Sequence, residues 1–200
     1  QYNIPIASIE RLSHGTTVGT NSLIQRIGGR IALITTRGFR DLLEIGRQTR
    51  PHMFDLYMDH PPALVEREHR IELNERVDAA GKVVRAPNND DIVAAVDAVI
   101  ASGAEACAVG FLFAFLNPDH EEKVAEVLRK RAPNIAISLS SEIQPEFREY
   151  ERLSTTVLNA YLQPVMGKYL HTLEQGVAAH APSPGYQSIQ WWAHVTPTSS

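Results

Sequence analysis

The segment best suited to chemistry in this sequence is a run of small and hydroxyl-bearing residues at positions 14–21, HGTTVGTN. We expect a strand to pass into a helix here, and the free N–H groups at a helix start favour an anion. Glycines in such a run let a ligand approach the backbone closely. His14 is the candidate catalytic group, because a histidine exchanges a proton near neutral pH. The candidates for binding substrate or phosphate are Gly15, Thr16, Thr17, Thr20 and Asn21.

The alternative for this segment is a purely structural role. Thr16 or Thr17 could simply cap the helix, with the His14 side chain satisfying the turn. The run differs from the phosphate-binding loop of P-loop enzymes, because no Gly-Lys-Ser/Thr follows it.

A second polar cluster follows a predicted strand at residues 31–36, and strand ends are where α/β proteins commonly place ligands. Arg40 with Asp41, or Arg47, is able to hold a carboxylate or phosphate through a two-pronged guanidinium contact. The alternative is an ordinary solvent-exposed charged helix.

Other patterns weigh against familiar metal and hydrolase sites. The histidines form neither His-Glu-x-x-His nor a Cys/His pattern, so we predict no metal-ligating residue. Ser140 lacks the Gly-x-Ser-x-Gly context of a nucleophile elbow. Residues 142–152 hold paired carboxylates that would suit Mg²⁺ or acid–base work. Their spacing is more typical of a solvated or interface helix face.

Helix and strand signals alternate along the chain, which predicts an α/β fold. The firmest stretch is residues 88–139, interpreted as helix, strand, helix and strand: a βαβ crossover preceded by one more helix. Asn88 is expected to help cap the first of these helices. The other predicted helices cover residues 17–27, 39–46 and 146–179, and the other predicted strands cover residues 31–36, 70–74 and 83–85.

Glycine and proline mark the expected irregularities. Gly28 or Gly29 is expected to end the helix at residues 17–27 in a left-handed conformation. A turn near residues 80–81 is expected to join the strands on either side of it. Pro164 is expected to kink or break the long helix. Residues 49–65 are predicted to form an irregular connection, and residues 186–195 are a candidate for a final strand.

Composition limits the class of partner. A formal charge of −4 and a pI near 6.1 give no reason to expect nucleic acid or an anionic membrane. The sequence has no apolar stretch long enough to span a membrane and no signal peptide at residue 1. Cys107 lies in an apolar run, where we expect a buried thiol, as in a cytoplasmic protein. The lack of a starting methionine suggests a cut end.

Several strings together resemble one family in order and spacing. They are residues 14–21 (HGTTVGTN), 32–41 (ALITTRGFRD), 43–48 (LEIGRQ), 116–121 (LNPDHE) and 140–169, which include REYER and NAYLQP. The family that they resemble is the N-terminal region of the hydantoinase A/oxoprolinase proteins. The resemblance implies an actin-like ATPase lobe of ribonuclease H-like α/β fold. We expect that lobe to be incomplete at its N-terminus, because the family's first phosphate-binding loop would precede residue 1.

The resemblance also implies a function. Family members use ATP and Mg²⁺ to phosphorylate an amide or ketone oxygen, and a partner subunit or domain completes ring opening or carboxylation. We therefore expect a fragment, inactive alone, of an oligomeric ATP-dependent hydrolase of hydantoinase or 5-oxoprolinase type. Its substrate would be a cyclic amide or related small molecule, and its partner a second hydantoinase-type subunit or domain.

Two alternatives and one domain assignment accompany that expectation. The parent protein could instead be a subunit of an ATP-dependent acetone or acetophenone carboxylase, or the isolated chain could be a non-catalytic assembly module. Residues 1–181 are assigned to the family domain. Residues 182–200 are assigned to a loop and a divergent C-terminal end.

Overall fold

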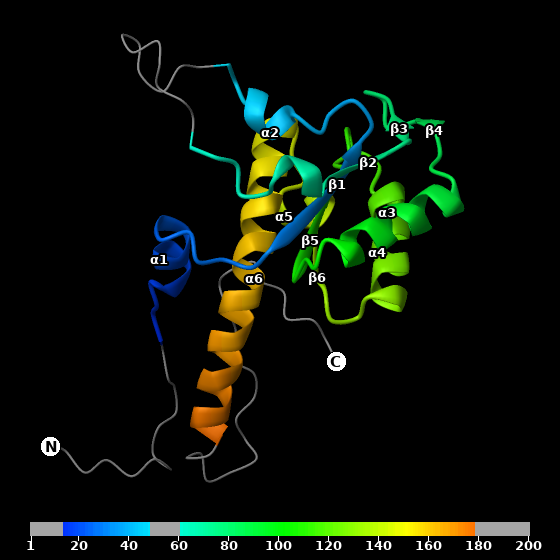
Figure 1. Ribbon diagram of the computed structural model, residues 1–200. Coiled ribbons are helices and arrows are strands. Elements are labelled where there is room, and N and C mark those ends of the chain that lie inside the picture. The colour runs from blue at the N-terminus through cyan, green and yellow to red at the C-terminus, as the bar shows by residue number, and fades with distance from the viewer. Residues whose placement is uncertain (1–13, 49–60, 179–200) are drawn as a thin grey trace, which may run out of the picture.

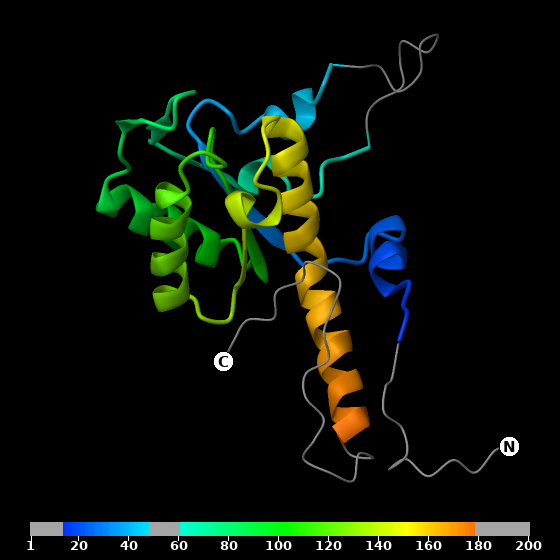
Figure 2. The same cartoon turned by 180° about the vertical axis from the view of Figure 1, so that it is seen from behind.

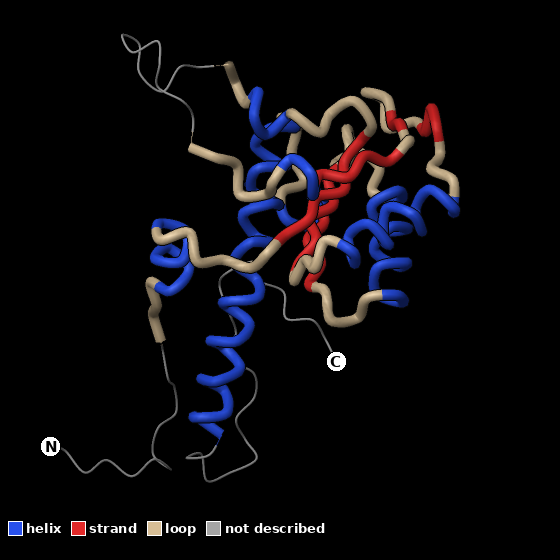
Figure 3. Tube along the Cα trace, in the orientation of Figure 1, coloured by secondary structure: helices blue, strands red, loops and turns tan. Residues whose placement is uncertain are grey.

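A parallel sheet forms the centre of the molecule. The computed structural model describes residues 14–48 and 61–178. Four parallel strands lie side by side in the order β2-β1-β5-β6 (Figures 1 and 3). The strands are β1 (Ile31–Thr36), β2 (Arg70–Leu73), β5 (Ala106–Gly110) and β6 (Ala136–Leu139). The expected α/β fold is confirmed.

Helices cover both faces of the sheet, which explains the composition of its two inner strands. Every residue of β1 and β5 is buried, and strands covered on both faces are apolar along their whole length instead of alternating. Cys107 lies in β5 with no exposed surface, as expected, and burial raises the pKa of its thiol to about 12.

The two helical layers differ in form. α3 (Asn89–Ala101) and α4 (Asp119–Arg131) pack on one face, and α6 (Glu149–Ala178) packs on the other (Figure 2). α6 extends well beyond the sheet, and α1 (Val18–Ile24) lies against it (Figure 1). None of the described helices has the length and apolar content needed to cross a membrane.

The stretch at residues 88–139 folds as predicted, for local reasons. The Asn88 side chain caps α3 by accepting a hydrogen bond from Asp90 N at 3.2 Å. α4 begins with acidic residues and ends with basic ones, which suits the helix dipole at both ends. The predicted helix at residues 39–46 is shorter, as α2 (Leu42–Ile45), and two further short helices are η2 (Arg67–His69) and α5 (Ser140–Ile143).

The predicted pairing of residues 70–74 with 83–85 is wrong. β2 joins the main sheet beside β1, and the hairpin instead pairs β3 (Arg76–Val77) with β4 (Val83–Arg85). The turn of this hairpin is held by Asp78, whose Oδ1 accepts the N–H groups of Ala80 and Lys82, each at 2.9 Å. The predicted turn near residues 80–81 is therefore correct, but the strand that precedes it in the hairpin is residues 76–77 and not residues 70–74.

The predicted end of the first helix is also wrong. α1 ends at Ile24, and the left-handed residue after it is Arg26 (φ 55°), in place of Gly28 or Gly29. Gly28 serves a close approach, since a Cβ there would lie 2.2 Å from the Tyr161 ring. Gly29 N donates to Tyr161 O at 3.0 Å.

α6 continues through Pro164 as one helix, so the proline does not break it. The hydrogen bond from Gly29 N reaches Tyr161 O, in the helical turn before Pro164. Proline has no N–H to donate, so the hydrogen bonding within the helix is weaker there. Part of the predicted connection at residues 49–65, and the predicted strand at residues 186–195, lie outside the described residues. Residues 182–200 lie outside them as well.

Candidate functional site

The carboxyl ends of the four parallel strands meet at one edge of the sheet, which is the edge where α/β proteins bind ligands. The loops that follow these strands carry polar side chains that the core holds in place. Two buried hydrogen-bond networks and two cavities lie at or beside this edge.

The first network centres on Glu121, which has no exposed surface although it is acidic. One carboxylate oxygen accepts from Phe111 N at 3.0 Å and from the Ser140 hydroxyl at 2.6 Å. The other accepts from Ser141 N at 2.9 Å and from the Ser141 hydroxyl at 2.7 Å. Burial raises the pKa of Glu121, and these hydrogen bonds act in the opposite direction. The carboxylate thus joins the segments that follow β5 and β6 to the first turn of α4.

Arg152 connects the same segments to α6. Its side chain is 2% exposed. It donates from Nη2 to Phe111 O at 3.0 Å, from Nη1 to Glu146 O at 2.8 Å, and from Nε to the Ser140 hydroxyl at 3.2 Å. The guanidinium also lies 5.1 Å from the centre of the Phe115 ring. Helices on both faces of the sheet are therefore tied to one set of loops.

The second network runs through a glutamate and a histidine. Thr36 Oγ1, at the end of β1, accepts from Leu112 N at 3.1 Å and donates to Glu75. The other oxygen of Glu75 lies 2.7 Å from His120 Nδ1. His120 is 2% exposed, and its Nε2 is buried without a hydrogen-bond partner in the described part of the chain. This network joins β1, β2 and β5 to α4.

The cavity between these networks is too small for a substrate. It is lined by Thr35, Leu42, Gly110, Phe111, Leu112, Ser140, Glu149, Arg152 and Leu153, and it holds about 10 Å³. That volume admits at most about one water molecule. The centre of the edge is therefore filled by the protein's own side chains.

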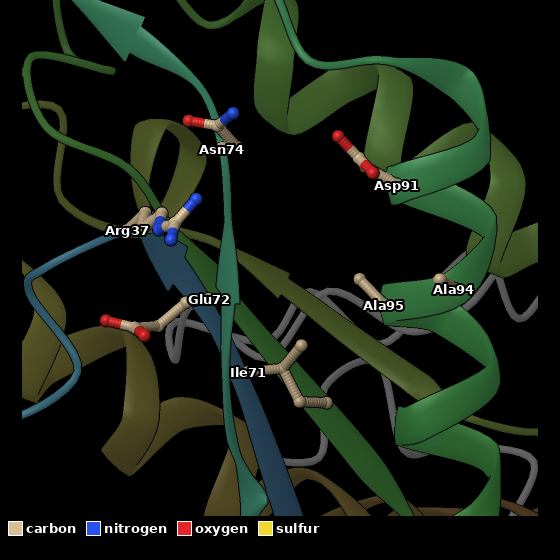
Figure 4. Close-up of a pocket in the computed structure, with 7 residues that line it drawn as sticks. All are labelled: Arg37, Ile71, Glu72, Asn74, Asp91, Ala94 and Ala95. Atoms are coloured by element: carbon tan, nitrogen blue, oxygen red, sulfur yellow. The ribbon is translucent and has the colours of Figure 1, made fainter.

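A much larger cavity lies at the side of the sheet, between β2 and α3 (Figure 4). Its volume is about 480 Å³. Small-molecule sites are typically roughly 300–1,000 Å³, so this cavity is large enough for one. It is lined by Arg37, Ile71, Glu72, Asn74, Asp91, Ala94 and Ala95.

The first predicted site segment, residues 14–21, lies away from both of these cavities. His14 is exposed, and its Nε2 is hydrogen-bonded to the Tyr169 hydroxyl of α6. Thr17 precedes the first residue of α1, and its hydroxyl accepts from Asn21 Nδ2 at 3.3 Å. Most of this segment is solvent-exposed, and neither described cavity is lined by it.

The other predicted site residues are held by partners within the protein. Arg67 binds Asp41 through two nitrogens, at 2.8 and 2.9 Å, and this hydrogen bonding lowers the pKa of Asp41. Arg40 Nη2 donates to Arg70 O at 3.0 Å. Arg47 pairs with Glu151 of α6. These three side chains stand near the ends of β1 and β2 but are not assembled into one open site.

Sequence reasoning did not single out the buried polar residues, although a signal for one of them was present. Glu121 precedes Val124, Ala125 and Leu128 by three, four and seven positions, so it lies on the apolar stripe of α4. In the sequence it stood only within the string LNPDHE at residues 116–121. Arg152 was expected on a solvated or interface helix face, and it is buried.

Comparison with known proteins places the chain in a family. The model described as "Hydantoinase/oxoprolinase N-terminal region" matches residues 1–132. The chain belongs to this hydantoinase/oxoprolinase family. The resemblance found in the sequence motifs is thereby confirmed.

Three relatives within the hydantoinase/oxoprolinase family carry informative names. Caprolactamase subunit alpha of Pseudomonas jessenii is 34% identical over 190 residues, covering 92% of this chain and 27% of that protein. The Saccharomyces cerevisiae 5-oxoprolinase is 31% identical over 214 residues, covering 94% of this chain and 16% of that protein. The acetophenone carboxylase gamma subunit of Aromatoleum aromaticum is 34% identical over 171 residues, covering 79% of this chain and 23% of that protein. The chain thus spans only a minor part of each.

A solved structure agrees with the hydantoinase/oxoprolinase assignment. The crystal structure of ATP-dependent caprolactamase from Pseudomonas jessenii matches with a TM-score of 0.83 and 32% identity. The match covers 90% of this chain and 26% of that one. The fold described above therefore recurs inside a larger protein.

The network around Glu121 predicts a specific loss of stability in the full-length protein. In Glu121→Gln, the amide nitrogen must face either Phe111 N or Ser141 N, so one buried donor loses its acceptor. We expect a loss of about 1–3 kcal/mol in the free energy of unfolding, measured by chemical denaturation. The matched control is Glu122→Gln, whose side chain is exposed in the same helical turn. Equal stability of the two variants would contradict this role for Glu121.

Proposed function

We propose that the protein carrying this chain is an ATP-dependent hydrolase of cyclic amides. The observation that carries the proposal is the match to ATP-dependent caprolactamase, with a TM-score of 0.83 over 90% of the chain. The relation to 5-oxoprolinase, 31% identical, supports the same class of reaction. Both names describe the opening of a cyclic amide.

The chemistry explains why such a reaction uses ATP. An amide carbon resists attack by water, whereas phosphorylation of its oxygen makes the carbon more electrophilic. Water can then add to the carbon, the C–N bond breaks, and the phosphoryl group is released as phosphate. ATP with Mg²⁺ would supply the phosphoryl group, and catalysis of such transfers rests mainly on positioning and charge stabilisation.

The described residues do not fit a nucleotide. The one described cavity of sufficient size has a free carboxylate, Asp91, opposite a single guanidinium, Arg37, while the Glu72 carboxylate accepts from Gly38 N. Carboxylates repel phosphate oxygens, so this donor set is unsuited to a triphosphate. We therefore do not assign the nucleotide to this cavity.

For this chain we propose that residues 14–21 face the substrate or a phosphate group in the whole protein. The support is chemical, because the segment is rich in hydroxyls and glycine, carries His14, and is exposed. Arg40, Asp41 and Arg47 are proposed in a secondary role. The hydrogen bond of Arg40 to Arg70 O and the ion pairs of Asp41 and Arg47 suit these residues to hold the loop after β1 in place near a ligand.

We also propose a partner subunit. Two relatives are named as subunits, the caprolactamase alpha subunit and the acetophenone carboxylase gamma subunit. A chain that spans 27% of one and 23% of the other accounts for only part of such an assembly. In that setting the described lobe would act together with further domains and a second polypeptide.

The second candidate function is carboxylation of a ketone, which the 34% identity to the acetophenone carboxylase gamma subunit favours. Activation of a ketone oxygen and of an amide oxygen would share the need for ATP. The two functions differ in the product, since one opens a ring with water and the other forms a new carbon–carbon bond.

The direct test uses the full-length protein with its partner subunit. It is incubated with caprolactam, 5-oxoproline or hydantoin, with and without ATP, and the products are measured by mass spectrometry. We expect ATP-dependent opening of at least one ring, accompanied by ATP hydrolysis. Inactivity on all rings, together with carboxylation of acetone or acetophenone from bicarbonate, would contradict the proposal and establish the second candidate. Absence of both activities would favour an assembly role.

The proposed role of His14 gives a separate prediction. General acid–base groups contribute roughly 10²–10⁴-fold to rate, so we expect a loss of that order in kcat/KM for ring opening in His14→Ala. Tyr169→Phe removes the hydroxyl bonded to His14 and serves as the control for a merely structural effect. If His14→Ala turns over at the wild-type rate, or if both variants lose activity equally, His14 has no catalytic role.

A further inference from the structure

The cavity between β2 and α3 has an apolar floor between two polar walls. Ile71 points from β2 toward Ala95 of α3, and Ala94 lies beside it (Figure 4). Arg37, which directly follows β1, approaches the cavity from the sheet side, and Asp91, in the first turn of α3, approaches it from the helix side. A cation and an anion therefore stand on opposite sides of a short aliphatic surface.

These two charged groups have no partners of their own. Among residues 14–48 and 61–178, the side chains of Arg37 and Asp91 make no hydrogen bond or ion pair. Most other charged groups around this edge are paired, as Asp41 is with Arg67 and Arg47 is with Glu151. Unpaired charges of opposite sign that share a cavity are available to a ligand that carries both charges.

The remaining polar groups of the cavity do not disturb that balance. Glu72 points away from α3 (Figure 4), and its carboxylate accepts from Gly38 N at 2.8 Å. The Asn74 side-chain oxygen accepts from Arg85 at 2.7 Å, which leaves the amide N–H groups of Asn74 able to donate. The cavity therefore presents two donors, Arg37 and Asn74, and one free acceptor, Asp91.

We propose that this cavity binds a small zwitterion, a linear amino acid whose carboxylate and ammonium groups are joined by a short aliphatic chain. Arg37 and Asn74 would take the carboxylate, Asp91 the ammonium group, and Ile71 with Ala95 the methylene chain. The volume of about 480 Å³ accommodates such a molecule. A nucleotide or dicarboxylate is disfavoured, because Asp91 would repel its second anionic group.

This inference rests on the proposed function and extends it to the product. When water opens a cyclic amide, the C–N bond breaks, the water oxygen joins the carbonyl carbon, and the nitrogen takes up protons. The product carries a carboxylate and an ammonium group at the two former ends of the amide bond. The cavity thus has the charge pattern of the ring-opened product and not that of the uncharged ring.

The binding test uses calorimetry on the full-length protein without ATP. The probes are 6-aminohexanoate and 4-aminobutyrate, compared with hexanoate and hexylamine, each of which lacks one charged end. We expect at least one amino acid to bind at least about tenfold more tightly than both single-ended compounds, because it alone contacts both walls. Equal affinity across the set, or no binding by any amino acid, would overturn the proposal.

Variants locate the binding in this cavity. Asp91→Asn should reduce amino-acid affinity at least about tenfold while leaving hexanoate binding unchanged. Arg37→Gln should also reduce amino-acid affinity at least about tenfold, while leaving hexylamine binding unchanged. Asp90→Asn is the matched control, since Asp90 is exposed in the same turn of α3 and does not line the cavity. Wild-type amino-acid affinity in both cavity variants would overturn the assignment.

The two proposals fail in different ways. Ring opening is read from product formation with ATP, and cavity binding is read from calorimetry without it. Tight amino-acid binding that needs Arg37 and Asp91, without ring opening, would remove the proposed function and keep the binding site. Ring opening without such binding would remove only the site.

Discussion

The carboxylate of Glu121 is the interaction on which the arrangement of the strand-end loops depends. A carboxylate with no exposed surface is costly unless donors surround it. Glu121 receives four hydrogen bonds, from Phe111 N, the Ser140 hydroxyl, and the N–H and hydroxyl of Ser141. Two of these donors are backbone N–H groups beyond the strand ends, where no neighbouring strand offers an acceptor. The Glu121 carboxylate supplies the acceptor instead. The loops after β5 and β6 are thereby fixed relative to α4.

This constraint has a consequence for function. Because Glu121 and Arg152 close the middle of the strand-end edge, the cavity that remains there is only about 10 Å³. The open space lies to one side, between β2 and α3, and the exposed residues 14–21 lie beside α6. Arg37 and Asn74 follow β1 and β2 instead, where Arg37 N donates to Leu73 O at 2.9 Å.

Much of the fold could be predicted from short-range patterns in the sequence. The strand at residues 31–36 and the order of elements over residues 88–139 follow from apolar runs, a capping asparagine and charged helix ends, all of which act over a few residues. The partner of β2 could not be read locally, because pairing with β1 depends on a contact between distant parts of the chain. Gly28 is a similar case, since its small size is needed only because Tyr161 lies against it.

The site was less accessible to sequence reasoning than the family. Strings of residues identify relatives whatever their three-dimensional setting, whereas burial decides what an ionisable side chain does. Arg152 was expected on a solvated or interface helix face and is buried, and Asp41 was a candidate binding residue and is held by Arg67. Neither Arg37 nor Asp91 was a candidate site residue, because their position on opposite sides of one cavity arises only when β1 and α3 are brought together.

The most direct test of the central claim is residue-resolved hydrogen–deuterium exchange on the full-length protein. Phe111, Leu112 and Ser141 lie outside the strands, and each donates its amide N–H to a buried side chain. We predict that these amides exchange at least about 100-fold more slowly than those of the exposed residues Ala80 and Lys82, which donate to the half-buried Asp78. Exchange of all five amides at similar rates would contradict the claim that buried side chains fix the strand-end loops.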